Sequence, residues 1–141
     1  MSNPVEAHLV NIEATVPPPD MLLVGVKGAH HTDIVRVRVA SDSMLKRGTL
    51  LMTAVIDSEK VFTVATEAGL AVHENSFAIL ADDVDIKSDE HADMAAYFEG
   101  DFNENAVIFP WVADVTDQPA AIEASREILR KNKIFLRAAH I

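Results

Sequence analysis

The segment most like a metal-binding loop runs from Asp101 to Asn105. Oxygen-bearing side chains stand at its alternate positions, as at the start of a calcium-binding EF loop. The sixth position of such a loop is glycine and the twelfth is glutamate, whereas this chain has Ala106 and Val112 there. Because the residue that permits the sharp turn and the bidentate ligand are both replaced, we expect neither a calcium site nor any other metal site.

Histidine and hydroxyl side chains form no recognisable catalytic pattern either. His30 and His31 are adjacent, so on an extended chain they point to opposite faces. His73 and His91 have no partner at the spacing of helical metal ligands, and the Ser41–Ser43 segment lacks the context of a nucleophile elbow. We therefore expect solvated or singly hydrogen-bonded histidines, no cofactor and no enzymatic activity.

The composition is that of one folded domain. The chain has 141 residues, 49% of them hydrophobic, and a formal net charge of −10 at pH 7. That apolar fraction is too high for a disordered acidic chain. The apolar runs are far shorter than the roughly 20 residues needed to span a bilayer, and the N-terminus lacks the pattern of a secretory signal. We expect no membrane partner, and the absence of cysteine excludes a disulfide framework.

The charges are unevenly distributed along the chain. The stretch from Asp82 to Glu104 holds nine acids and one base, while five of the twelve bases lie in the last sixteen residues. A solvated acidic surface and a helix with basic residues near its end explain most of this pattern. The alternative is that the acidic middle of one subunit faces the basic tail of the next. Without clustered bases and stacking aromatics, we expect no nucleic-acid partner.

The first twenty residues differ from the rest. Met1–Asp20 contains no Lys, Arg or Gly and includes three consecutive prolines, which favour a stiff extended spacer. We interpret this segment as an N-terminal arm, followed by a domain over residues 21–141. Val10, Ile12 and Val16 lie on one face of the arm if it is a strand, and a helical pattern fits the segment equally well. Such an apolar stripe either packs on its own domain or adds to the sheet edge of a partner.

Short strands dominate the rest of the chain. The Asp33–Ala40 segment alternates valines with Ile34 and arginines, which predicts a half-buried strand. Thr49–Ile56 and Val61–Ala65 are separated by turn residues and predict a hairpin. Met94–Phe98 fits a helical turn or a strand. Further short apolar runs follow, at Met21–Val26, Phe77–Leu80, Ala106–Ala113 and Ile134–Leu136.

One amphipathic helix is predicted late in the chain. It begins near Asp117, has Pro119 in its first turn, and places Ile122 and Leu129 on one face. Glu127 and Lys131 are spaced for an i,i+4 ion pair. Many short strands with one late helix and no strand–helix alternation indicate a mainly β, α+β domain.

Four phrases of the sequence resemble, in the same order, those of the small head decoration proteins of lambda-like tailed phages. The resemblance covers roughly Asp33 to Ile141. The phrases are RGTLL (47–51), AILADDVD (78–85), MAAYFEGDFNENAVIFP (94–110) and IEASREILRKNKIFL (122–136).

The resemblance implies a β-clip-like fold, in which bent two-stranded ribbons form an incomplete small barrel. It also implies a capsid decoration, or cement, protein that sits as a homotrimer at local three-fold positions. Such a protein is made in the host cytoplasm and lies on the outer surface of the virion, where it contacts the major capsid protein through its N-terminal arm. Strand periodicity then points to Val10, Ile12 and Val16 as the capsid-binding residues. A small β-rich ligand-binding module and a small enzyme remain the alternatives.

Overall fold

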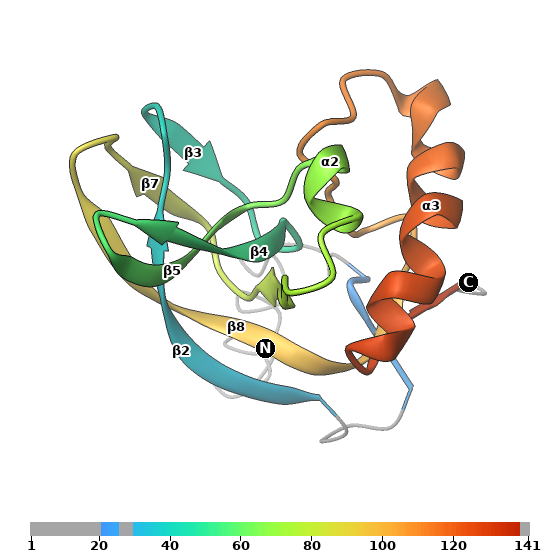
Figure 1. Cartoon of the computed structure of the whole chain (residues 1–141). Coiled ribbons are helices and arrows are strands. Elements are labelled where there is room, and N and C mark those ends of the chain that lie inside the picture. Colours follow the sequence, from blue (N-terminus) through green and yellow to red (C-terminus); the bar gives the residue numbers. More distant parts are fainter. Residues whose placement is uncertain (1–20, 26–29, 139–141) are drawn as a thin grey trace, which may run out of the picture.

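The structure is a computed structural model that describes residues 21–25 and 30–138. Within these residues the fold is mainly β with one long helix near the C-terminus (Figure 1). The elements, in order, are β1 (Leu23–Val24), β2 (His31–Arg38), β3 (Ser43–Leu45), β4 (Leu50–Ile56), β5 (Glu59–Val64), α2 (Glu67–Leu70), β6 (Phe77–Leu80), β7 (Val84–Ile86), β8 (His91–Asn103), the 3-10 helix η1 (Val115–Asp117), α3 (Gln118–Lys131) and β9 (Ile134–Arg137). The predicted fold class is confirmed.

Strand β8 joins most of the molecule together. Its first nine residues pair antiparallel with β2, and its last residues pair with β1 on one side and with β9, in parallel, on the other. The Met94–Phe98 segment, which the sequence left open between helix and strand, lies inside β8. Cross-strand pairing decides this segment, because two consecutive alanines by themselves also suit a helix.

The main sheet curves back on itself without closing into a barrel. Its strands lie in the order β1-β8-β2-β5-β4-β6, and β6 also pairs with β8. The links that would complete a ring are short. Strands β2 and β5 share one residue pair, Val37 with Phe62, and β6 and β8 share only two. Strands β3 and β7 form a separate two-stranded ribbon. The fold therefore consists of bent strand pairs that curve around an apolar interior without closing into a barrel.

The predicted hairpin is present. Strands β4 and β5 pair in register from Leu51 with Val64 to Ile56 with Glu59. Asp57 and Ser58 make the turn with φ of 51° and 66°. Positive φ at both central residues is characteristic of the two-residue turn whose twist matches that of the strands.

The alternation predicted for Asp33–Ala40 is also confirmed. Val35, Val37 and Val39 are buried, whereas Ile34 on the other face is exposed. Arg36, also on that outer face, bonds to Glu59 at 3.0 Å and to Asp93 at 3.2 Å. The outer face of β2 is thus charged and ion-paired, as expected for a strand with one side in water.

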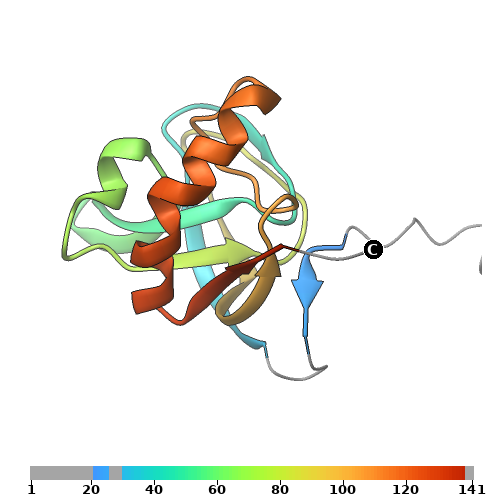
Figure 2. The ribbon, with the colours of Figure 1, turned by 90° about the vertical axis from the view of Figure 1, so that its right-hand side faces the viewer.

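Helix α3 begins where the sequence predicts and covers one end of the sheet (Figure 2). Its buried face consists of Ala121, Ile122, Ser125 and Leu129. One expected detail is wrong: Glu127 accepts a 2.7 Å bond from Arg130, three residues away, rather than from Lys131. The one-turn helix α2, capped by the Thr66 side chain, lies between β5 and β6 and has no counterpart among the predicted elements.

Two apolar clusters hold these elements together. One lies under α3 and includes Phe102, Phe109, Leu129 and Ile134; the other fills the inside of the curved strands and includes Val37 and other small side chains. The Ala106–Ala113 run, expected as a short apolar element, is a loop that lies over the first cluster. Val107 and Phe109 point inward and are 1% exposed, and Ile108 between them forms one parallel bridge with Thr49. The run therefore serves core packing and adds a single bridge rather than a full strand.

Candidate functional site

The three residues predicted to bind the capsid, Val10, Ile12 and Val16, lie outside the described residues, as does all of the predicted arm, Met1–Asp20.

The oxygen-rich segment beginning at Asp101 is part of the protein framework. Asp101 Oδ1 lies 3.5 Å from Arg137 Nε, and the Oδ1 of buried Asn103 accepts a 3.1 Å bond from the Asn105 N–H. Across the described ranges, no three His, Asp or Glu side chains are grouped so that they could hold a metal ion. The oxygens that imitate a calcium loop are used to fix the chain after β8.

His30 is a structural histidine. Its Nε2 is 2.6 Å from the Asp101 carbonyl oxygen, and its ring meets Phe102 edge-on, with centroids 5.2 Å apart. The ring lies directly over Gly100, where a side chain would overlap it. This is the singly hydrogen-bonded role that the sequence suggested for the histidines.

Three of the four phrases that resemble the decoration family meet at Gly48. The Gly48 N–H donates to the Leu80 carbonyl at 2.8 Å, and the Gly48 carbonyl accepts from the Ile108 N–H at 2.9 Å. A Cβ at Gly48, where φ is 98°, would lie 2.8 Å from the Ala106 oxygen. These phrases therefore specify a close backbone junction, which only glycine fits without strain.

The Arg47 side chain also holds this junction together. Its Nη1 donates to the Ala81 carbonyl and to the Tyr97 hydroxyl, both at 2.8 Å. The guanidinium carbon lies 5.5 Å from the centre of the Tyr97 ring, and the Arg47 backbone N–H donates to Asp83 Oδ1. Residues from all three phrases are thus held together by one side chain.

The acidic middle and the basic tail meet within a single chain. Glu104 bonds to Arg126 at 2.6 Å, Glu99 lies 3.8 Å from Lys133, and Asp101 pairs with Arg137 as described above. The hydrogen bonds that Arg126 donates to Glu104 and Glu123 raise the pKa of Arg126 above its ordinary value. These acids and bases, for which a contact between subunits was the alternative interpretation, pair with each other inside the subunit.

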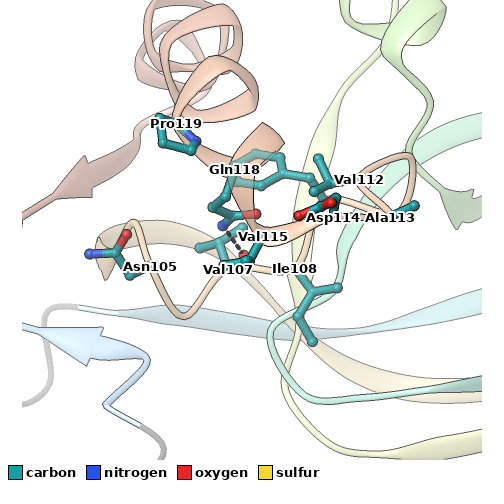
Figure 3. A pocket seen from close by; sticks show the side chains of 10 residues that line it. Asn105, Val107, Ile108, Val112, Ala113, Asp114, Val115, Gln118 and Pro119 are labelled. Atoms are coloured by element: carbon teal, nitrogen blue, oxygen red, sulfur yellow. Dashed lines mark hydrogen bonds between the residues drawn. The ribbon is translucent and has the colours of Figure 1, made fainter.

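An open apolar surface surrounds Ile108, which lines two hollows. The first, of about 530 Å³, lies between the loop after β8 and the start of α3 (Figure 3), and its lining includes Val112, Val115 and Pro119. The second, of about 520 Å³, lies beside β3, and its lining includes Met44 and Pro110. We call Met44, Ile108, Val115 and the two hollows the Ile108 surface.

Three apolar side chains of this surface project into solvent. Val115 is 82% exposed, Met44 73% and Ile108 39%. No sequence pattern predicts their exposure: Val115 stands between polar residues, Met44 lies in a three-residue strand, and Ile108 lies between the buried Val107 and Phe109. Their exposure depends on how the chain turns over the core.

Two polar side chains around the first hollow, Gln118 and Asp114, are hydrogen-bonded to the backbone. Gln118 Nε2 donates to the Val107 carbonyl at 3.0 Å and to the Glu104 carbonyl at 3.3 Å. Asp114 accepts from the Thr116 N–H at 3.0 Å, and the hydrogen bonds from Thr116 hold the pKa of Asp114 below its ordinary value. None of the hollows described here is lined by a histidine.

A scan against known protein families finds no matching family model, and a search of curated proteins finds no match. No helix in the described part of the chain is long and apolar enough to cross a membrane. The Ile108 surface combines exposed apolar side chains with two open hollows, and such a surface suits contact with another protein.

Proposed function

We propose that this protein is a capsid decoration protein of a tailed phage, which binds the outer surface of the expanded head as a homotrimer at local three-fold positions. The observation that carries the proposal is the junction at Gly48. The phrases that resemble the decoration family come from three distant parts of the chain, and their residues bond to one another there. Phrases that form one structural unit support a shared fold more strongly than phrases scattered over a surface.

The proposed role follows from mass action. A protein that binds the assembled, expanded lattice, and not its dissociated subunits, stabilises the lattice by the free energy of that binding. Three binding segments on one trimer raise the effective concentration of each, so the trimer binds far more tightly than one segment alone. The partner is the major capsid protein, and the protein contributes no catalysis and needs no cofactor.

The N-terminal arm, Met1–Asp20, is the capsid-binding segment of this proposal. An arm that adds a strand to a sheet edge of the capsid protein gains backbone hydrogen bonds, and its side chains set the register. Val10, Ile12 and Val16 are the residues that we assign to this contact, because they lie on one face of an extended chain.

Co-sedimentation with expanded, undecorated capsids of the parent phage tests the role and the arm together. We expect the full-length protein to saturate near one subunit per capsid protein, and the protein without residues 1–20 to bind weakly or not at all. A variant with Val10, Ile12 and Val16 replaced by serine serves as the finer test. A variant with the alternate residues Asn11, Glu13 and Thr15 replaced by serine is its control.

Failure of the full-length protein to bind such capsids would refute the decoration role. Undiminished binding by the truncated protein would retain that role and refute the assignment of the arm.

A further inference from the structure

We propose that the Ile108 surface is where copies of this chain meet, with the Met44 side of one copy against the Val115 side of the next. The inference rests on the proposed function for the number of copies, three, but the surface itself is argued from the structure. The partner is therefore a second copy of this chain, placed head to tail around a three-fold axis.

Apolar exposure is the first argument. Met44 and Val115 expose about three quarters or more of their side chains, and each lines a hollow that has Ile108 in its wall. Each hollow is large enough to receive a protruding apolar side chain from a neighbouring molecule. Burying these side chains and hollows against each other removes apolar area from water, which is the main favourable term in association.

Charge complementarity is the second argument, and it selects the partner. The hollow beside Met44 is bordered by Lys46, which forms no ion pair with any described residue. Asp114 is the only charged residue that lines the Val115 hollow; it is exposed and forms no ion pair inside the described chain. Asp85, which pairs with Met44 across the β3–β7 ribbon, does not line the Met44 hollow. The Met44 side is therefore basic at its hollow and the Val115 side acidic at its hollow, so each hollow complements the other hollow of a second copy.

The arrangement of the two sides fits a ring. A cyclic trimer needs two different faces on each subunit, because each subunit contacts its two neighbours through opposite sides of the interface. Here the two faces flank a single residue, Ile108, which lines both hollows. With Ile108 near the three-fold axis, the basic side of each copy faces the acidic side of the next.

Crosslinking can test this contact directly, because the chain has no cysteine of its own. A double variant, Met44→Cys with Val115→Cys, is treated with a short bismaleimide and run on a denaturing gel. We expect covalent trimers from the double variant and monomers from each single variant, since head-to-tail contact brings unlike positions together. The control is Met44→Cys with Val55→Cys, because Val55 is 72% exposed on β4 but lies outside the Ile108 surface. This control should remain monomeric.

A matched pair of charge insertions provides the second measurement. Val115→Lys and Val55→Lys change two strongly exposed valines, so both variants should fold. Sedimentation velocity of the full chain should show trimers for the wild type and for Val55→Lys, and at least ten-fold weaker association for Val115→Lys, because the new lysine faces Lys46 of the next copy. A monomeric wild type, covalent dimers as the end product, or equal association of the two variants would each overturn the proposed contact.

The two proposals fail separately. Capsid binding by wild-type protein whose cysteine variants give no crosslink would overturn the interface and leave the decoration role intact. Covalent trimers that bind no expanded capsid would support the interface and refute the role.

Discussion

Charged side chains at the C-terminal end of β8 are ion-paired within the described chain, whereas those at the Ile108 surface are not. At the end of β8, Glu99, Asp101 and Glu104 each pair with a base from α3, β9 or the turn between them. At the Ile108 surface, Lys46 and Asp114 have no ionic partner within the described chain, and they stand beside side chains that are strongly exposed and apolar.

This difference separates structural from recognition charges. Ion pairs at the end of β8 attach the C-terminal helix and strand to the sheet, so their contribution belongs to folding. Unpaired charges on a surface contribute little to folding, because water solvates them well. Beside an exposed apolar patch, they can instead orient a partner and exclude wrong ones. The two regions should therefore respond differently to mutation.

The largest expected effect is on the junction beneath the Ile108 surface. Gly48→Ala places a Cβ 2.8 Å from the Ala106 oxygen at a φ of 98°, and we expect a loss of about 3 kcal/mol in the free energy of unfolding. Urea denaturation measures it. Gly25→Ala is the control. It has a similar φ of 90°, but its nearest neighbour is the Asp101 side chain, at 3.2 Å, which can move. Equal losses for the two variants would contradict the claim that backbone crowding defines this junction.

A smaller loss of stability is expected at the end of β8. Glu104→Gln weakens the bond to Arg126. Because the Glu104 side chain is only 16% exposed, this change should lower the free energy of unfolding by about 1–2 kcal/mol. Glu127→Gln breaks the open pair with Arg130 and should change it by less than about 0.5 kcal/mol. Trimer formation should be unaffected in both. If Glu104→Gln abolished trimers at unchanged stability, the division between structural and recognition charges would be wrong.

The smallest effect concerns pH at the Ile108 surface. Hydrogen bonds from Thr116 lower the pKa of Asp114 from its ordinary value of 3.8, so the stability from this carboxylate is present above about pH 4 and lost as pH falls through the lowered pKa. Carbon-detected NMR titration should place the Asp114 pKa below 3.8, and in Thr116→Ala it should rise partway back. An Asp114 that titrates at or above 3.8 in the wild type would show that the bonds do not form in solution.

The local sequence pattern was sufficient to predict the conformation of segments whose own residues determine it. The hairpin turn at Asp57 and Ser58, the buried valines of β2 and the start of α3 at Gln118 follow from turn propensity, period-two alternation and proline placement. These signals need no knowledge of distant residues, because neighbouring residues supply the constraint.

Prediction failed or stayed open where distant segments decide. Met94–Phe98 is a strand because β2 and β6 pair with it, and Ala106–Ala113 is a loop because the core beneath it accepts Val107 and Phe109. Glu127 bonds to Arg130 rather than to Lys131. Residues three and four positions away both lie within reach on a helix surface, so spacing alone does not decide between them.

The sequence by itself determined the mainly β class, the late amphipathic helix, the acidic character and the phrases that suggest a capsid role. Only the tertiary structure decided that three of those phrases meet at Gly48, that the basic tail pairs within its own chain, and that Met44, Ile108 and Val115 share one exposed surface. The physical reason is that periodicity and turn chemistry act over a few residues, whereas exposure and pairing depend on contacts between segments far apart in the chain.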